Sequence, residues 1–333
     1  MDWAMLIEWV VKALLLTVIL LTGFAYTTYL ERKVLAWIQV RIGPNRAGPW
    51  GLLQPAADGI KLIFKEELIP AYADKIIFVL APVITMIPAL IINAVIPWGR
   101  EVVIFGRKVA LYLADVNVGV LYIMAVASIS VYGVVLAGWS SNNKYSLLGG
   151  LRASAQMISY ELALGLAFLP PIMLAGTLNL REIVEAQRSM WYVVYQPIAA
   201  FIFLVTSIAE VNRAPFDLPE AEQELTAGYH TEYSGMKFAL FFMAEYTKMI
   251  AVSAIFASLY LGGYLGPFES QFPWLGPVYL ALKIFLGLFL MIWLRATFPR
   301  FRYDQLMALG WKGLFPLALL NVVVTAGVLA LVG

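Results

Sequence analysis

Long apolar stretches alternate with shorter polar ones along the chain, and eight of the apolar stretches are long enough to cross a bilayer. A helix needs about 20 apolar residues to span a hydrocarbon core about 30 Å thick. The pattern therefore predicts an all-α, polytopic membrane protein with eight transmembrane helices in a single domain, residues 1–333. The predicted spans are 5–30, 76–96, 116–138, 155–176, 191–209, 238–261, 277–294 and 314–332.

The longest connection, residues 31–75, combines turn residues with a helical pattern. Its first part contains G-P-N-R-A-G-P-W-G, which is typical of ordered turns. Apolar residues then recur at helical spacing opposite a polar stripe, which predicts a short amphipathic helix at the membrane boundary or against a partner. It would be a plain interfacial anchor or lie at the mouth of a cavity. The apolar positions are Leu53, Ala56, Ala57, Ile60, Ile63 and Phe64, and the polar ones are Gln54, Asp58, Lys61 and Lys65.

The composition excludes several classes of protein. Hydrophobic residues make up 62% of the chain and charged residues 13%, whereas a soluble domain carries about 25% charged residues. The near-balance of 23 basic and 21 acidic residues argues against a nucleic-acid binder. With no Cys and one His, the chain lacks the ligands for a zinc site, an iron–sulfur cluster or a bis-His haem. No cofactor or metal is expected in this chain, and any electron carrier must belong to a partner.

The basic residues indicate which way the chain lies in the membrane. Most Lys and Arg residues fall in the loops after the first, third, fifth and seventh predicted spans. Basic loops stay on the cytoplasmic side. These loops, which also carry the polar motifs, are therefore expected to form the working surface on the inner side.

Several charged residues lie inside or at the ends of predicted spans. A charge at mid-bilayer costs about 2.5–3.5 kcal/mol on insertion scales, so each needs a partner or a function. Glu161, Glu210 and Glu245 belong to three consecutive spans, and Lys248 and Lys283 are also enclosed. A purely structural role remains open: Glu245 would pair with Lys248, and Glu161 would bond to a neighbouring helix. Three such carboxylates together favour a proton relay.

The connection from Glu210 to Glu232 is strongly acidic. It would be either a solvated acidic loop or, if packed, a gate whose protonation responds to nearby charge. His230 is expected to be a hydrogen-bonded loop histidine rather than a catalytic one. The acidic residues of this connection are Glu210, Asp217, Glu220, Glu222, Glu224 and Glu232, against the single Arg213.

Four motifs resemble the H subunit of respiratory complex I, and the resemblance covers essentially the whole chain. The first is E-R-K-V-L-A-W-I-Q-V-R-I-G-P-N-R-A-G-P-W-G-L-L-Q-P-A-A-D-G-I-K from Glu31, and the second is E-V-N-R-A-P-F-D-L-P-E-A-E-Q-E-L-T-A-G-Y-H-T-E from Glu210. The others are N-K-Y-S-L-L-G-G-L-R-A-S-A-Q and W-L-R-A-T-F-P-R-F-R-Y-D-Q-L-M.

The resemblance implies a membrane subunit that encloses much of the chamber for ubiquinone or menaquinone. Its partners would be peripheral quinone-module subunits, small membrane subunits and the lipid bilayer, with FMN and iron–sulfur clusters in the partner subunits. The positions that match the chamber are Glu31, Arg32, Gln39, Arg41, Asp58, Lys61, Arg213, Phe216, Asp217 and Arg295.

The resemblance also implies roles for the acidic residues. Glu161, Glu210 and Glu245 match a proton relay. Glu220, Glu222 and Glu224 match a coupling loop between the chamber and the relay. Some relatives carry another Glu on the third span, where this chain has Ser128 and Ser130, so a hydroxyl or water would replace that link.

The expected function is therefore that of the quinone-chamber and energy-coupling subunit of a proton-translocating NADH–quinone oxidoreductase in a bacterial inner membrane. A mitochondrial inner membrane is the alternative location. Other hypotheses are a same-fold subunit of a ferredoxin- or F420-linked quinone reductase or membrane-bound hydrogenase, a stand-alone secondary ion transporter, and a passive membrane scaffold. Within this chain no convincing inverted repeat supports the transporter.

Overall fold

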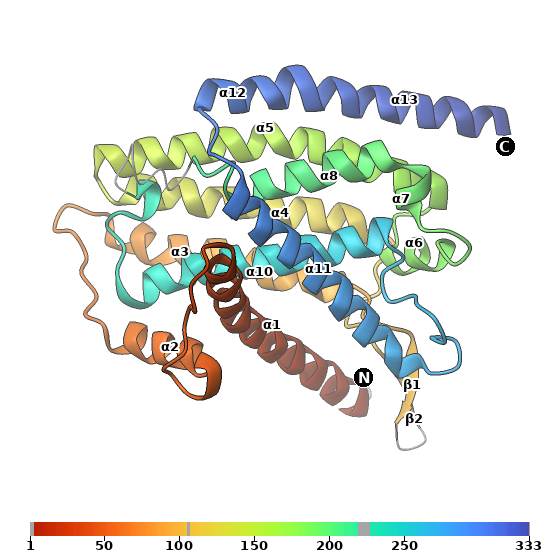
Figure 1. Cartoon of the computed structure of the whole chain (residues 1–333), viewed down its shortest axis with the longest axis horizontal. Helices are drawn as coiled ribbons and strands as arrows, with labels where there is room; N and C mark the ends of the chain where they lie inside the picture. The colour runs from red at the N-terminus through yellow and green to blue at the C-terminus, as the bar shows by residue number, and fades with distance from the viewer. Residues whose placement is uncertain (1–2, 105–106, 219–226, 333) are drawn as a thin grey trace.

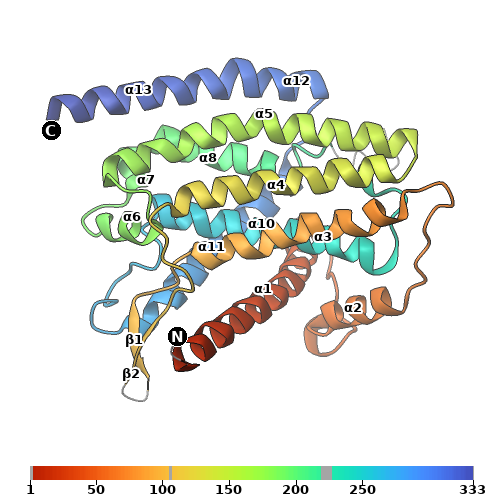
Figure 2. The same ribbon diagram turned by 180° about the vertical axis from the view of Figure 1, so that it is seen from behind.

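The computed structural model describes residues 3–104, 107–218 and 227–332, and these form a bundle of long helices, as predicted (Figure 1, Figure 2). Seven helical segments in these ranges are long and apolar enough to cross a membrane. They contain α1 (Trp3–Ile38), α3 (Lys75–Ile91), α4 (Gly119–Ser140), α5 (Lys144–Ala175), α10 (Gly235–Tyr260), α11 (Gly276–Thr297), and the run α12 (Tyr303–Ala308), the π-helix η5 (Leu309–Leu314) and α13 (Phe315–Val332).

The fifth predicted span differs from the expectation of one helix over residues 191–209. It is divided into a single turn, α7 (Tyr192–Tyr195), and α8 (Pro197–Glu210). The break falls at Gln196, whose φ of −130° and ψ of 57° are not helical, because a residue before proline is disfavoured in the α region. At 1.5 Å per residue, the 14 residues of α8 extend only about 21 Å, less than the core of a bilayer.

The core lies where the middle helices pack together. Helix α10 contacts α3 and α11, while α5 contacts α4, α8 and α13 (Figure 2). Helix α5 begins at Asn143, whose side chain accepts a hydrogen bond from the backbone N–H of Tyr145, and ends at Gly176 with a φ of 69°. By contrast, α1 and α13 are largely exposed, as expected for helices that contact lipid or other subunits.

The connections carry several short elements. Strands β1 (Glu101–Ile104) and β2 (Arg107–Ala110) form an antiparallel hairpin, which the sequence analysis did not predict. The hairpin and α6 (Leu180–Ala186) lie at one end of the bundle, called here the hairpin end, and α2 (Gln54–Phe64) lies at the other, the α2 end (Figure 1). The remaining 3-10 turns are η1 (Pro49–Gly51), η2 (Ile92–Val95), η3 (Gly228–His230) and η4 (Pro273–Leu275).

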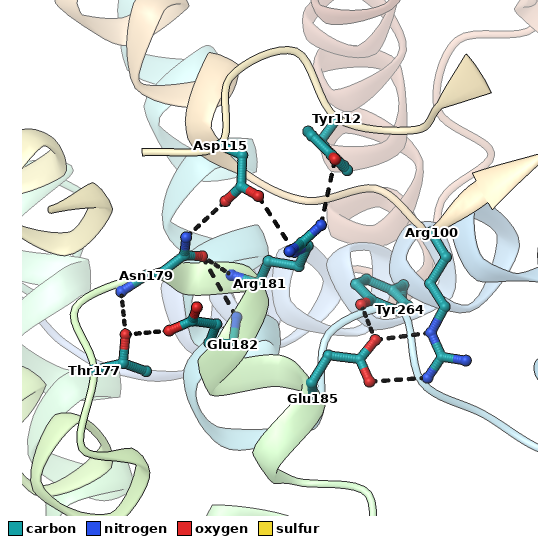
Figure 3. Close-up of polar contacts among 9 residues, drawn as sticks. All are labelled: Arg100, Tyr112, Asp115, Thr177, Asn179, Arg181, Glu182, Glu185 and Tyr264. Atoms are coloured by element: carbon teal, nitrogen blue, oxygen red, sulfur yellow. Dashed lines mark hydrogen bonds and ion pairs between the residues drawn. The ribbon is translucent and has the colours of Figure 1, made fainter. Parts of the chain in front are cut away.

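Polar side chains connect the loops at the hairpin end (Figure 3). Glu185 of α6 accepts two hydrogen bonds from Arg100, at 2.7 and 2.9 Å, and one from the hydroxyl of Tyr264, at 2.6 Å. Asp115 forms a second group with Asn179 and Arg181. These bonds join the hairpin, α6 and the loop after α10, and so fix the hairpin end.

Glu185→Gln should destabilise the hairpin end. Burial alone would raise the pKa of Glu185, but the hydrogen bonds from Arg100 and Tyr264 outweigh burial and lower it. A carboxyl whose pKa is lowered by folding stabilises the native state above its ordinary value near 4.5, and this contribution is lost as the pH falls further. Replacing a charge-assisted acceptor costs about 1.5–3 kcal/mol.

The measurement is thermal inactivation of the solubilised protein in its complex, at pH 7 and at pH 4. Glu8→Gln is the control, because the Glu8 side chain, which pairs with Lys12, is more exposed than that of Glu185. The variant should inactivate at a lower temperature at pH 7, and the difference should shrink at pH 4. Equal stability of Glu185→Gln and the unmodified protein at pH 7 would contradict the role of this network.

Candidate functional site

Four charged side chains from four segments meet inside the bundle. Glu31 of α1 contacts the guanidinium groups of Arg295, at the end of α11, and of Arg213, in the loop after α8. Arg213 lies 3.5 Å from Glu31 and 2.6 Å from Glu245 of α10, with its guanidinium 4.4 Å from the ring centre of Tyr246. Glu31, Arg213, Glu245 and Arg295 are called the four-charge cluster below.

The four-charge cluster balances its own charge, because it holds two carboxylates and two guanidinium groups. Buried charges are tolerated when they are paired in this way. Arg213 is the central member, since its side chain is 5% exposed and lies between both carboxylates. Its backbone is fixed by a tight turn in which the N–H of Phe216 donates to the carbonyl of Arg213 at 2.8 Å.

A second group of polar residues follows along α10. Lys248 lies one turn after Glu245, and its Nζ is 4.0 Å from Oε1 of Glu210. The same ammonium donates a 2.6 Å hydrogen bond to Ser130 of α4. Ser128, close by on α4, donates a hydrogen bond to the carboxylate of Glu161 on α5.

Two small cavities link these groups. A cavity of about 20 Å³ is lined by Glu245, Glu210 and Lys248, and another of about 50 Å³ by Glu210, Lys248 and Glu161. A water molecule needs about 10–15 Å³ and polar partners, so both cavities have room for water next to their charged side chains, although the larger one is otherwise lined by apolar residues. The three span carboxylates named by the sequence analysis therefore line two adjoining cavities that share Glu210 and Lys248.

The other predicted chamber positions divide into separate groups. Arg32 forms a 2.6 Å ion pair with Asp58 of α2, which joins α1 to α2. Arg41 donates to Gln39 at 2.7 Å on the exposed surface just beyond α1, and Lys61 is exposed on α2. The structure thus brings Glu31, Arg213 and Arg295 together, whereas the remaining first-loop positions lie outside the four-charge cluster.

Phe216 and Asp217 lie beside the four-charge cluster. The ring of Phe216 packs against Tyr160 and Phe301, with ring centres 5.5 Å apart in both pairs. Asp217 follows directly after Phe216 and is half-buried. Both residues therefore belong to the wall that holds Arg213 in place.

Helix α2 is amphipathic, as predicted, and its orientation distinguishes its two faces. The apolar residues Ile60, Ile63 and Phe64 are 58%, 61% and 83% exposed, whereas the carboxylate of Asp58 turns toward Arg32. The apolar face thus points away from this chain, toward lipid or a partner. On the polar side Asp58 pairs with Arg32 of α1, whereas Lys61 and Lys65 are exposed.

The acidic connection is described only in part. Glu220, Glu222 and Glu224 lie outside the described residues. Glu232 accepts a 2.7 Å hydrogen bond from Asn143, so this end of the connection is packed. His230 packs edge-on against the rings of Tyr229, Phe238 and Phe242, and burial lowers its pKa to about 4, which leaves it neutral at pH 7.

Two contacts differ from what the sequence suggested or were missed. The structural alternative paired Glu245 with Lys248, but Glu245 forms its 2.6 Å ion pair with Arg213 instead. The bond from Lys248 to Ser130 was also missed, although the two serines on the third span were the available signal. In the described ranges, no group of three or more His, Asp or Glu side chains is placed to hold a metal.

The fold and its buried charges define a multi-pass membrane protein with ionisable groups inside the helix bundle. The chain belongs to the NADH dehydrogenase family, which matches residues 11–326. It is 55% identical over 305 residues to the H subunit of the NADH-quinone oxidoreductase of Protochlamydia amoebophila, covering 92% of each chain. It is 53% identical to an H subunit of the Geobacter metallireducens oxidoreductase, covering 96% of each, and 51% identical to the H subunit of the Thermomicrobium roseum oxidoreductase, covering 98% of this chain and 97% of the relative.

Proposed function

We propose that this chain is the quinone-chamber and energy-coupling membrane subunit of a proton-translocating NADH–quinone oxidoreductase. The observation that carries the proposal is a row of buried and half-buried charges, which runs from Arg295 and Glu31, through Arg213 and Glu245, to Glu210 and Glu161. A buried row of this kind costs free energy, which membrane proteins accept where charge or protons must move. The names of its relatives agree with an oxidoreductase that acts on quinone.

The chamber is assigned to the α2 end, where Arg32 and Asp58 hold α2 against α1. A polar headgroup would be guided by the charged wall, and its tail would lie beside the apolar face of α2. FMN and iron–sulfur clusters of partner subunits would supply the electrons, and ubiquinone or menaquinone would accept them. The proposed chamber residues are Glu31, Arg32, Gln39, Arg41, Asp58, Lys61, Arg213, Phe216, Asp217 and Arg295.

The coupling step is assigned to Arg213, because it is shared between Glu31 on the chamber side and Glu245 on the membrane side. Quinone reduction changes the charge beside Arg295 and Glu31, which alters the pairing of Arg213. Glu245, Glu210 and Glu161 then exchange protons across the two cavities. Moving one charge against 100 mV costs about 2.3 kcal/mol, so a strongly downhill reduction can drive several such steps.

The proposal extends to the coupling loop and to the partners. Glu220, Glu222 and Glu224 would respond to the charge of the chamber, since they follow Arg213 and Asp217 closely in the chain. The exposed apolar faces of α1, α2 and α13 would be covered by lipid and by peripheral and small membrane subunits. The membrane would be a bacterial inner membrane.

The chamber assignment is tested by Arg295→Ala. Arg295 contacts Glu31 and, under this proposal, would bind the quinone headgroup, so Arg295→Ala would remove a charge-assisted hydrogen bond to the headgroup worth about 1.5–3 kcal/mol. We expect the KM for a short-chain quinone to rise about tenfold or more, while electron transfer to a hydrophilic acceptor that takes electrons from the partner subunits is retained. Steady-state kinetics of the assembled complex provide both values.

Arg302→Ala is the matched control, because Arg302 lies seven residues further on and forms an exposed pair with Asp304. Its KM should equal that of the unmodified complex. If Arg295→Ala also leaves the KM for short-chain quinone unchanged, Arg295 does not belong to the chamber.

A further inference from the structure

Lys248 occupies a position that the roles assigned so far do not use. It belongs to α10, its side chain is 10% exposed, and its ammonium lies near Ser130 of α4 and Glu210 of α8. Lys248 and Glu210 both line the two cavities. One of these cavities is also lined by Glu245 and the other by Glu161. Glu210 and Lys248 therefore lie between the cavity that contains Glu245 and the cavity that contains Glu161.

The contacts of Lys248 fix its ammonium on the α4 side. Nζ donates to Ser130 at 2.6 Å and lies 4.0 Å from Glu210. The hydroxyl of Ser130 in turn donates to the carbonyl of Ala127 at 2.7 Å, which orients it to accept from Lys248. At 4.0 Å the ammonium attracts the Glu210 carboxylate without forming a short contact that would immobilise it.

Lys248 lines the two cavities that contain the three carboxylates of the row, Glu210, Glu245 and Glu161. Glu245 has its own close partner in Arg213, at 2.6 Å, and Glu161 has the hydroxyl of Ser128. Glu210 has Lys248 as its ion-pair partner. Removing Lys248 therefore leaves the middle carboxylate of the row without the cation that balances it.

We propose that Lys248 is a positioning residue that holds Glu210 as an accessible carboxylate between the two cavities, so that protons pass from one half of the path to the other through Glu210. This inference rests on the relay role in the proposed function. A proton leaves the carboxyl group of Glu245 for the Glu210 carboxylate, and then leaves Glu210 for the Glu161 carboxylate, or the reverse. Lys248 keeps its protons throughout, and no other bond changes.

The test uses the complete complex in proteoliposomes, with NADH oxidation and proton uptake measured in the same sample. Lys248→Met should lower the number of protons moved per electron at least threefold, while electron transfer in the presence of an uncoupler stays above half. Lys248→Arg, which retains the charge, should recover more than half of the decrease in protons moved per electron. A merely structural role would lower both activities together and would not be rescued by the charge.

Lys283→Met is the matched control. Lys283 is another lysine within a membrane-spanning helix, and its ammonium donates to the backbone carbonyls of Leu261, Gly263 and Leu265 rather than to a carboxylate. The assembled Lys283→Met complex should move as many protons per electron as the unmodified complex. If Lys248→Met does not assemble, Ser130→Ala serves instead, because it frees the ammonium from α4, and it should lower the ratio about twofold.

The outcomes separate this inference from the function on which it rests. If Lys248→Met moves a normal number of protons per electron, Lys248 does not position Glu210 for proton transfer. The same conclusion follows from a normal number in Ser130→Ala, where that variant is used. If Glu210→Gln lowers the ratio in the same experiment, the relay stands without Lys248. A normal ratio in Glu210→Gln removes the relay itself.

Discussion

Arg213→Met should reduce the amount of assembled, active complex to below a tenth. Arg213 lies between Glu31 and Glu245, and its side chain is 5% exposed. Removing one partner of a buried ion pair costs about 3–5 kcal/mol, because the remaining charge stays buried without compensation. Here one change leaves Glu245 without its close partner and Glu31 with only Arg295, so the cost falls at the upper end of that range.

Membrane content of the complex, by native electrophoresis, and NADH–quinone activity per complex measure this effect. Arg213→Lys keeps the charge but lacks the planar group that reaches both carboxylates, so it should restore assembly more than activity. The double change Arg213→Met with Glu245→Met removes a charge of each sign and should assemble better than Arg213→Met alone. If Arg213→Met assembles normally, the four-charge cluster does not hold these helices together.

Gly133→Ala should prevent the close packing of α3 and α4. A Cβ at Gly133 would lie 2.1 Å from Oγ1 of Thr85, 2.8 Å from the backbone N of Thr85 and 2.9 Å from the carbonyl O of Ala81. The Thr85 hydroxyl can rotate away, but the two backbone atoms cannot move without displacing α3. Overpacking of this kind costs about 1–3 kcal/mol or more, and Thr85 also lines the cavity beside Glu245.

Gly327→Ala on α13 is the matched control, because a Cβ at this position would meet no neighbouring side chain or helix within 4 Å. Alanine also favours a helix over glycine, so this change should leave assembly unaffected or slightly improved. Gly133→Ala should lower the assembled complex to a small fraction and reduce the thermal stability of what remains. If Gly133→Ala and Gly327→Ala give equal amounts of assembled complex, close contact between α3 and α4 at Gly133 is not required.

The sequence predicted the elements whose signal is local. Seven of the eight apolar runs appear as long helices, because length and apolar composition alone decide which segments can span a bilayer. Residues 191–209 failed as a single helix because Pro197 interrupts the run after Gln196, a signal that was present in the sequence. The hairpin between β1 and β2 was missed because four-residue strands give a weak pattern.

The sequence analysis named Glu31, Arg213, Glu245 and Arg295, which the fold brings together, but it did not predict how they pair. Glu31, Arg213 and Arg295 are 264 positions apart at the extremes, and no periodicity in the sequence brings them together. A local rule paired Glu245 with Lys248, one turn apart, yet the folded chain places Arg213 closer. Long-range packing therefore decides which charged residues pair. Residue type and the cost of burial indicate only that each buried charge needs a partner.

The central claim is that buried carboxylates carry protons in response to quinone reduction. The number of protons moved per electron by the Glu210→Gln complex in proteoliposomes tests it most directly, because Glu210 lines both cavities and is 6% exposed. Glutamine keeps the shape and cannot exchange a proton as a carboxyl group does. We expect the ratio to fall below half while uncoupled electron transfer from NADH to quinone continues. An unchanged ratio, with the complex fully assembled, would contradict the account.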